Sequence, residues 1–487
     1  MRSLLFCLGA CLGCLLGVMI PLRADNKAVI VHEWGTFTSL QDENGQAIGG
    51  INVDDEPVPG FVWGWGGVKT TAGNAFPVGG FGLPPWYGGK GWMPGDQDVT
   101  MRLETPVLYF YPPKGQTPQS VPPLTVHVDF QAGFLSQYYP YAEVNGSPGK
   151  FPFEILKDQR LSEVTSGLTW KDVRLGSTAK PVETDDKVWT TPREVSAPLL
   201  QVTQPPAWNG QSQDSAKPQA EHFLFYRGVG HLDSLLRLRM DVPSQIRISD
   251  HPSPGQSALF DEGWLVEIHS DGSCAFRTKL GGSAMVEMGG CVFSPIKPAA
   301  FSEDEFNTDN LVKLKASMQD ALVKEGLYPD EASAMLRTWE LSYFKSPGLR
   351  FFYLVPRVWV DKTLPLKITG AQTDISRVMI GRIELISDAQ KAALARLAAG
   401  PCPDLAAVKK AAQDALQNSK LPKADADAFY RGEKPLSELG IAIPPLVQDY
   451  LSLGRFRDAL IVHEQQQHPS PALAQFIKDN GLAAQSN

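Results

Sequence analysis

Two of the eight histidines of this chain lie within residues 221–233, EHFLFYRGVGHLD, together with a tyrosine, an arginine and an aspartate. An apolar, strand-like run is followed there by the glycine-flanked, turn-like sequence 228–230. A turn centred on this sequence would place Arg227 opposite His231, with Asp233 on the same face, because side chains alternate along a strand. The sequence therefore predicts a cluster of Arg227, His231 and Asp233 beside a hairpin turn.

Two interpretations of this cluster remain open. In one, Arg227 and Asp233 form an ion pair at the rim of a sheet and His231 caps it. In the other, the arginine holds an anionic or polyol group and His231 transfers protons. The second histidine, His222, points to the opposite face and lies roughly 15 Å away along the ribbon, so the two histidines do not suggest one metal site.

Two further acids are candidate catalytic residues. Residues 28–40, AVIVHEWGTFTSL, are typical of a strand, and they carry the adjacent pair His32 and Glu33. Adjacent strand residues face opposite sides, so these two cannot serve one site unless a bulge, which Gly35 could mark, re-aims one of them. The simpler interpretation is a strand in which Glu33 is hydrogen-bonded locally. Glu104 precedes a Thr-Pro pair and is an acid at a predicted strand start.

The segment 57–95 is rich in tryptophan and glycine, and its only charged residues are Lys69 and Lys90. No helical or strand periodicity holds across it, which predicts a long loop. Its four tryptophans are candidate binding residues: Trp63, Trp65, Trp86 and Trp92. They could stack on sugar rings, clamp a partner, or cover an otherwise exposed apolar sheet, and the sequence leaves these alternatives open.

Residues 1–24 have the order of a signal peptide: Arg2, an apolar run, and a plausible cleavage region that ends at Ala24. The sequence therefore predicts export to the periplasm or the exterior. Removing this segment takes away two arginines and no acids, so 45 basic residues become 43 against 53 acidic ones, a net charge of −10. Without a basic run, nucleic acid is not an expected partner. The mature chain has no apolar stretch long enough to span a bilayer.

Three cysteines would remain after cleavage: Cys274, Cys291 and Cys402. Two strand-like runs flank residues 281–284, and a two-residue turn at 282–283 would pair Cys274 directly with Cys291. Opposed residues lie within disulfide range, and export would favour oxidation. The sequence predicts this disulfide and a free thiol at Cys402, whereas a bulge at 289–290 would slip the register and leave all three cysteines unpaired.

The elements that must position these residues fall into two parts. Residues 25–386 are dominated by short strand-like runs with a helical excursion at 302–344, and residues 387–487 have helical periodicity. The expected class is α+β, with an antiparallel, sandwich-like β part followed by an all-helical region. Strands are predicted at 107–111, 124–130, 188–191, 245–248, 264–269, 349–356, 358–360, 366–368 and 378–386. Helices are predicted at 311–325, 330–344, 388–399, 404–418, 424–430, 444–453, 455–466 and 471–480.

Four segments, HEWGTFT at 32–38, RLETPVLYF at 102–110, FYRGVG at 225–230 and VMIGRIEL at 378–385, together resemble a family of uncharacterised exported bacterial proteins. The resemblance covers the β part and its helical excursion and is weaker in the helical tail. It implies export and a shared fold, and it supplies no activity, substrate or catalytic residue.

Three classes of function follow from these observations. The first expectation is a non-catalytic binding or structural protein of the cell envelope, because no catalytic motif is present. The alternative is a carbohydrate-active enzyme or carbohydrate-binding protein that uses the Trp-rich segment, with Glu33 and Glu104 nearby. The third is a metal-dependent hydrolase, although the histidines are scattered. No cofactor and no metal site are expected, and carbohydrate or an envelope protein is the expected partner. Convergence of Glu33, Glu104, Arg227 and His231 in one pocket would favour an enzyme, and their dispersal would favour a scaffold.

Overall fold

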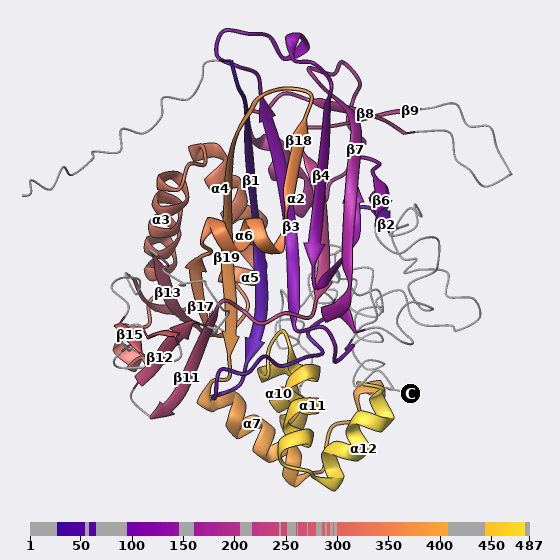
Figure 1. Cartoon of the computed structure of the whole chain (residues 1–487). Coiled ribbons are helices and arrows are strands. Elements are labelled where there is room, and N and C mark those ends of the chain that lie inside the picture. The colour runs from indigo at the N-terminus through magenta and orange to yellow at the C-terminus, as the bar shows by residue number, and fades with distance from the viewer. Residues whose placement is uncertain are drawn as a thin grey trace, which may run out of the picture.

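The computed structural model is a mixed α and β protein with one large, strand-rich sheet, and its helices lie mainly in the C-terminal half (Figure 1). It describes residues 27–53, 58–64, 95–145, 160–204, 217–242, 245–250, 260, 262–269, 271–278, 285–287, 290–292, 296, 300–407 and 444–482. The predicted signal peptide lies outside these residues. Among the helices described, none is long and apolar enough to cross a membrane.

The strands of the main sheet, with β8 and β9 joined at its edge, are β1 (Val29–Gln41), β2 (Trp63–Gly64), β3 (Met101–Tyr111), β4 (Leu124–Gln131), β5 (Gly133–Tyr139), β6 (Glu143–Asn145), β7 (Thr165–Leu175), β8 (Leu200–Gln204), β9 (Lys217–Glu221), β10 (Leu224–Gly230), β13 (Gly263–Ile268), β14 (Cys274–Arg277), β17 (Gly348–Leu354), β18 (Leu366–Thr369) and β19 (Thr373–Leu385). A small second sheet holds β11 (Leu236–Val242), β12 (Gln245–Asp250), β15 (Met285–Glu287) and β16 (Gly290–Val292). The helices are α2 (Lys187–Thr190), α3 (Asp309–Lys324), α4 (Pro329–Thr338), α5 (Glu340–Phe344), α6 (Arg357–Thr363), α7 (Asp388–Ala399), α10 (Pro445–Ser452), α11 (Arg457–Gln467) and α12 (Pro471–Asn480).

The strand order of the main sheet is β14-β13-β17-β19-β1-β3-β10-β5-β7-β4-β18, so β1 lies near its centre. The sheet is not purely antiparallel as expected, because β1 and β19 run parallel along their whole length. The antiparallel pairing of β1 with β3 shifts register between Trp34 and Thr36. This irregularity lies at Gly35, where the sequence allowed a bulge but did not require one.

The sheet curls over one of its faces, which we call the inner face and which carries Glu33. The Trp170 ring of β7 lies 6.2 Å from the Tyr226 ring of β10, although β5 separates these strands in the strand order. Helix α6 contacts both β19 and β4 across the same face. The inner face is therefore enclosed by the sheet itself and by α6, which lies in front of the sheet in Figure 1.

The opposite face of β1 is covered by α4 and α5, and we call it the helix face. It carries His32 and Thr36, whose partners are Glu331 of α4 and Tyr343 of α5. The predicted helical excursion is confirmed here, and Gly326, at φ +114°, follows the end of α3. The predicted second helix is divided into α4 and α5 at Trp339.

The helical region that follows the sheet begins with a capping box, in which Ser387 and Gln390 exchange hydrogen bonds of 2.9 and 3.2 Å. Helices α7, α10, α11 and α12 gather at one end of the sheet (Figure 1). Their apolar side chains form a hydrophobic core with residues of β1, β5 and β10, such as Leu40, Phe134 and Val229. The predicted helices that fall within 408–443 lie outside the described residues.

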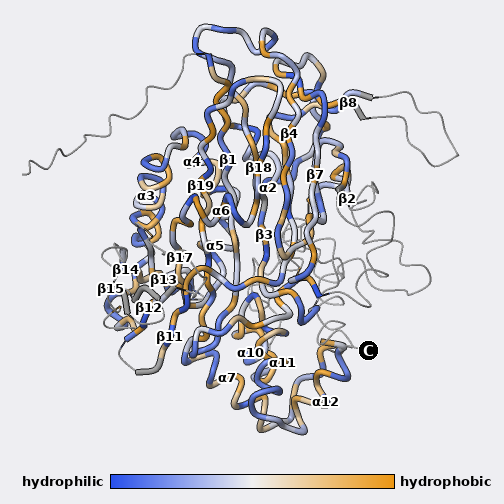
Figure 2. Tube along the Cα trace, in the orientation of Figure 1, coloured by the Kyte–Doolittle hydropathy of each residue, from blue (hydrophilic) through white to orange (hydrophobic). Residues whose placement is uncertain are grey.

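Both hydrophobic and hydrophilic residues occur along the central strands (Figure 2), and buried residues alternate with more exposed ones along β4. Two predicted strands are wrong. Residues 188–191 belong largely to α2, whose first turn is capped by the Asp186 carboxylate, which accepts from the Val188 amide at 3.0 Å. Residues 358–360 belong to α6, which Pro356 precedes at the N-cap position. In both segments a β-branched composition is outweighed by a local helix start signal.

The predicted hairpin turn at 228–230 is also wrong, because β10 continues as a strand through Gly230. A Cβ atom on Gly228 would lie 2.1 Å from the Phe134 carbonyl oxygen, and one on Gly230 would lie 2.7 Å from that of Ala132. These glycines therefore permit close approach of β5 and its preceding residue rather than a chain reversal.

Candidate functional site

His32 and Glu33 address opposite faces of β1, as the strand periodicity predicts. The His32 Nδ1 atom lies 2.7 Å from Glu331 Oε2 on the helix face. Glu33 accepts a hydrogen bond from the Tyr226 hydroxyl and forms an ion pair with Arg377 on the inner face. Glu33 is not bonded locally as the simpler interpretation expected, since these partners are 193 and 344 residues away. The two adjacent residues therefore belong to separate clusters.

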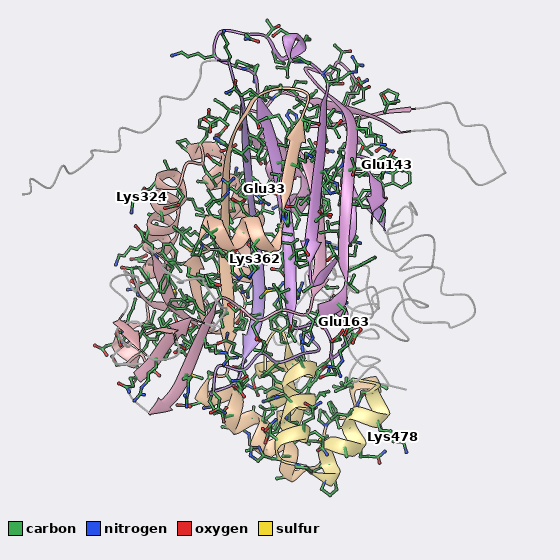
Figure 3. The ribbon with its side chains drawn as sticks, in the orientation of Figure 1. Glu33, Glu143, Glu163, Lys324, Lys362 and Lys478 are labelled. Atoms are coloured by element: carbon green, nitrogen blue, oxygen red, sulfur yellow. The ribbon has the colours of Figure 1, made fainter. Side chains whose placement is uncertain are left out.

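The inner-face cluster consists of Glu33, Tyr226, Arg377 and Asp361. Arg377 Nη1 donates to Asp361 Oδ1 at 2.9 Å and to the Leu364 carbonyl at 2.6 Å. The Glu33 side chain is 0 % exposed, and Figure 3 labels it near the centre of the molecule, whereas Lys324 and Lys478 project from its edge. Glu33 is thus a buried ion-pair partner at the middle of the sheet.

The electrostatics of the inner face favour the charged form of Arg377. Burial, the largest influence, would lower the pKa of Arg377, but Glu33, Tyr226 and Asp361 together raise it above the usual range. Burial, and then the Glu33 carboxylate, raises the pKa of Tyr226 well above 10.0, so this hydroxyl stays protonated and donates. Arg377 and Tyr226 are therefore both donors in this cluster.

On the helix face, His32 is oriented by a buried carboxylate. Glu331 Oε2 also accepts from the Tyr328 amide at 2.7 Å, while Oε1 accepts from the Tyr111 hydroxyl at 2.7 Å. The His32 ring lies 4.6 Å from the ring of Tyr328, which is 38 % exposed. A carboxylate on Nδ1 fixes the orientation of an imidazole, which is the arrangement that acid–base histidines require.

A second group of charges on the helix face lies further along β1, and we call it the arginine cluster. Its members are Arg102, Arg350, Arg382 and Arg455 with Glu104 and Glu384. Glu104 Oε1 lies 3.0 Å from Arg102 Nη2 and 2.8 Å from Arg455 Nη2, and the Thr38 hydroxyl donates to Oε2 at 2.8 Å. The Glu104 side chain is 0 % exposed.

The rest of the arginine cluster surrounds Glu384 of β19. Arg382 Nε donates to Glu384 Oε1 at 2.6 Å, and Arg350 Nε lies 3.5 Å from the same oxygen. Burial lowers the pKa of Arg350 to about 10, with Glu384 opposing this shift and Arg382 and Arg455 adding to it. Burial would raise the pKa of Glu384, but the three arginines around it lower it overall. Arg350 and Glu384 are therefore both charged at neutral pH.

The residues 227, 231 and 233 do not lie beside a turn, because β10 has none there. Arg227 is buried within β10 and donates to Gln137 of β5. His231 Nδ1 lies 2.8 Å from Asp98 Oδ1, and Asp233 lies 3.9 Å from Arg237 at the surface. The catalytic roles of Arg227, His231 and Asp233 remain predictions. The hairpin turn on which those predictions were based is not present.

Among the four tryptophans, Trp63 is the one that the structure describes. It is buried in β2, and its Nε1 donates to Gln219 Oε1 at 3.1 Å. This placement matches the alternative in which tryptophans cover an apolar sheet. Trp65, Trp86 and Trp92 lie outside the described residues.

The predicted disulfide between Cys274 and Cys291 is wrong. Cys274 belongs to β14, where it pairs with Ile268 of β13 in the main sheet, whereas Cys291 belongs to β16 and pairs with Val286 in the small sheet. The two runs expected to form one hairpin thus join different sheets. Cys274 and Cys402 are free thiols, and burial raises the pKa of Cys274 to about 11. The free thiol predicted at Cys402 is confirmed.

Several site residues were not found from the sequence: Tyr111, Glu331, Arg350, Arg377, Arg382 and Glu384. The available signal was the presence of charged residues inside otherwise apolar strands, since such residues are rarely buried unless they are paired. Arg382 and Glu384, two positions apart in β19, carry that signal. No group of three potential metal ligands occurs within the part of the chain that the structure describes.

No protein-family model matches the chain, and no curated protein matches it. One solved structure found by comparison is the "Fcho1 Mu homology domain (Danio Rerio) with bound Eps15 peptide", at 8 % sequence identity. The match covers 74 % of this chain and 93 % of that chain, with a TM-score of 0.22. We base nothing on a likeness of this degree.

Proposed function

We propose that this chain is an exported protein of the cell envelope that acts through binding or a structural role and not through catalysis. The observation that supports this proposal is the dispersal of the candidate catalytic residues. Glu33 lies on the inner face and Glu104 on the helix face, and each is in an ion pair with its side chain 0 % exposed. Arg227 and His231 have other partners.

The positions of Glu33 and Glu104 do not allow both carboxylates to reach the same substrate bond. Glycoside hydrolysis needs two carboxyl groups that flank one scissile bond, about 5–10 Å apart on the substrate side. Two carboxylates on opposite faces of one sheet cannot flank the same bond. Each also accepts a hydrogen bond from arginine, which occupies an oxygen atom that a substrate would have to reach.

The absence of catalysis can be tested with variants next to each carboxylate. Tyr226→Phe removes the hydrogen bond to Glu33, and Thr38→Val removes the one to Glu104, with little change in side-chain volume. We expect wild type and both variants to hydrolyse chromogenic glycosides and esters no faster than a heat-denatured sample. Turnover by wild type that falls at least tenfold in either folded variant would contradict the proposal.

Export is supported by the order of residues 1–24 alone. We expect the protein isolated from the envelope or medium fraction to begin near Asp25. Mass spectrometry of its N-terminal peptide measures this directly, and an intact Met1 in the mature protein would contradict export.

A second candidate function is carbohydrate binding, which one observation favours. Tyr328 is a partly exposed aromatic side chain beside His32, and an exposed ring is a platform on which a sugar can stack. A glycan array probed with wild type and Tyr328→Ala tests this candidate, with Val312→Ala as an exposed apolar control. Binding lost in Tyr328→Ala alone would support it, and the absence of any wild-type binding would exclude the sugars on the array.

A further inference from the structure

The helix face opens to solvent where β1 begins. Cross-strand pairing arranges two rows of side chains there, because directly paired residues project to the same face of a sheet. The first row is Asp374, Ile30 and Tyr111, and the second row is Ser376, His32 and Tyr109. His32 and Tyr109 are buried, whereas Asp374 is exposed. The start of β1 is therefore the end of the helix face that a ligand can reach.

The connection between α3 and α4 lies over these rows. A Cβ atom on Gly326 would lie 3.1 Å from Ser376 Oγ, so the connection passes close to the second row. Two residues further on, the Tyr328 ring lies 4.6 Å from the His32 ring and 5.0 Å from the Tyr111 ring. Tyr328 is 38 % exposed, so its ring is an accessible aromatic surface beside both rows.

One buried carboxylate holds both His32 and Tyr328 in place. Glu331 Oε2 accepts from the Tyr328 amide at 2.7 Å and lies 2.7 Å from His32 Nδ1. A carboxylate accepts hydrogen bonds, so Nδ1 carries the proton in this contact, and Nε2 of the neutral ring is then an acceptor. His32 is 5 % exposed, and its Nε2 has no hydrogen-bond partner among the described residues. The aromatic surface is thus fixed next to an acceptor that these residues leave unused.

The charges that act on the Tyr328 phenol are negative. Burial raises the pKa of Tyr328, and three carboxylates raise it further: Glu331, Asp330 and Asp374. The carboxylate of Asp374 is exposed and has no hydrogen-bond or ion-pair partner among the described residues. Lys324, which ends α3 at the edge of the molecule in Figure 3, forms an ion pair with Glu262 at 3.2 Å. The site therefore favours a ligand that brings positive charge and hydrogen-bond donors.

We propose that this site binds an amino sugar with a free, protonated amine, whose ring stacks on Tyr328 and whose ammonium group lies beside Asp374. A sugar ring can pack on an aromatic side chain, and an ammonium group is attracted by the face of that ring as well as by a carboxylate. The sugar hydroxyl groups supply donors for His32 Nε2. This inference rests on the carbohydrate-binding candidate and deepens it, because it names the class of sugar.

Isothermal titration calorimetry of the full mature chain tests the proposal with two sugars that differ only at the amine. These are a tetramer of glucosamine and the N-acetylated tetramer of the same linkage, in a buffer in which the free amine is protonated. We expect the glucosamine tetramer to bind about tenfold more tightly. Added sodium chloride should reduce this preference, because an exposed ion pair is screened by salt.

Variants of the exposed side chains locate the binding. Asp374→Asn removes only the charge, and Tyr328→Ala removes the ring, so each should weaken binding of the glucosamine tetramer about fivefold. Tyr328→Phe keeps the ring and should bind nearly as wild type does. Asp388→Asn is the matched control, because it neutralises a 100 % exposed carboxylate on α7, and it should leave the affinity unchanged.

Tetralysine supplies amines without a sugar ring, and it should bind more weakly than the glucosamine tetramer. Equal binding of the two sugar tetramers would overturn the amino-sugar inference and leave the carbohydrate-binding candidate in place. Binding of neither tetramer would overturn the inference for these sugars and leave the structural role of the protein in place. Unchanged affinity in both Asp374→Asn and Tyr328→Ala, or tighter binding of tetralysine, would each overturn the proposed site.

Discussion

The inner face and the helix face of β1 both bury glutamate among arginine side chains, in different proportions. On the inner face, the single guanidinium group of Arg377 lies between Glu33 and Asp361, and the Tyr226 hydroxyl supplies a further donor to Glu33. On the helix face, Glu104 contacts Arg102 and Arg455, and Glu384 contacts Arg350 and Arg382. One arginine therefore lies between two acids on the inner face, whereas each glutamate of the arginine cluster lies between two arginines.

This difference shows that a buried glutamate at the centre of a sheet can be held in two ways. On the inner face, one arginine and one tyrosine hydroxyl hold Glu33. In the arginine cluster, two arginines hold each glutamate. The same six-residue stretch of β1, from Glu33 to Thr38, contributes to both arrangements because successive side chains alternate between the faces.

The largest expected effect is that of Glu33→Gln on the inner face. It leaves the buried Arg377 without its main counter-charge, and we expect the free energy of unfolding to fall by about 4 kcal/mol. Urea denaturation followed by tryptophan fluorescence measures this change. The double variant Glu33→Leu with Arg377→Met should recover most of the loss, since neither charge remains, and a single-variant loss below about 1 kcal/mol would refute the role of the pair.

Glu104→Gln should lower the free energy of unfolding by slightly less than Glu33→Gln does, about 3 kcal/mol. The reason is that Arg455, which pairs with Glu104, is 6 % exposed. This variant removes the carboxylate that Arg102 and Arg455 share, whereas Glu33→Gln removes the carboxylate of one arginine, so added sulfate should restore more stability to Glu104→Gln than to Glu33→Gln. Urea midpoints of both variants, measured with and without sulfate, make the comparison. Equal restoration of the two variants would show that the number of arginines around each glutamate does not matter.

Glu384→Gln should produce a loss that depends on pH. The pKa of Glu384 is lower in the folded protein than its ordinary value of 4.5, so its charged form stabilises the fold above that pH. We expect the variant to be about 2 kcal/mol less stable than wild type at neutral pH. The difference should diminish as the pH falls below 4.5 and through the lower folded pKa. A difference that stays constant from neutral pH to pH 3 would contradict this assignment.

The smallest effect should come from a surface pair outside both clusters. Lys171 and Glu143 form an ion pair at 2.7 Å with both side chains exposed. Solvent screens such a pair, so Lys171→Gln should change the free energy of unfolding by less than about 1 kcal/mol. A loss as large as that of Glu104→Gln would mean that burial is not what distinguishes the two clusters.

Local patterns predicted much of the fold. The strand-like composition of residues 28–40 predicted β1, and the helical periodicity of residues 388–399 predicted α7. The glycines at 228–230 led to the wrong prediction of a hairpin turn, because glycine permits close approach of two strands as well as turns. The disulfide prediction was wrong because it assumed that the two strand-like runs pair with each other in one hairpin. In the structure the two runs pair with different strands.

The site was far less predictable, and the reason is sequence separation. The partners of Glu33 come from β10 and β19, and the histidine next to it finds its carboxylate 299 residues away on α4. Alternation shows which residues share a face of one strand, but it does not show which strands will be neighbours. The charged residues could be recognised as unusual within apolar strands, whereas their pairing required the strand order.

The central claim, that the carboxylates of both faces are buried ion-pair partners and not reacting groups, can be measured by carbodiimide labelling of the native protein with peptide mass spectrometry. Asp388, whose side chain is 100 % exposed, provides the internal reference for a reachable carboxylate. We expect Glu33 and Glu104 to remain unlabelled while Asp388 is modified, and to react only after unfolding in urea. Labelling of Glu33 or Glu104 in the native protein at a rate comparable to that of Asp388 would contradict the account.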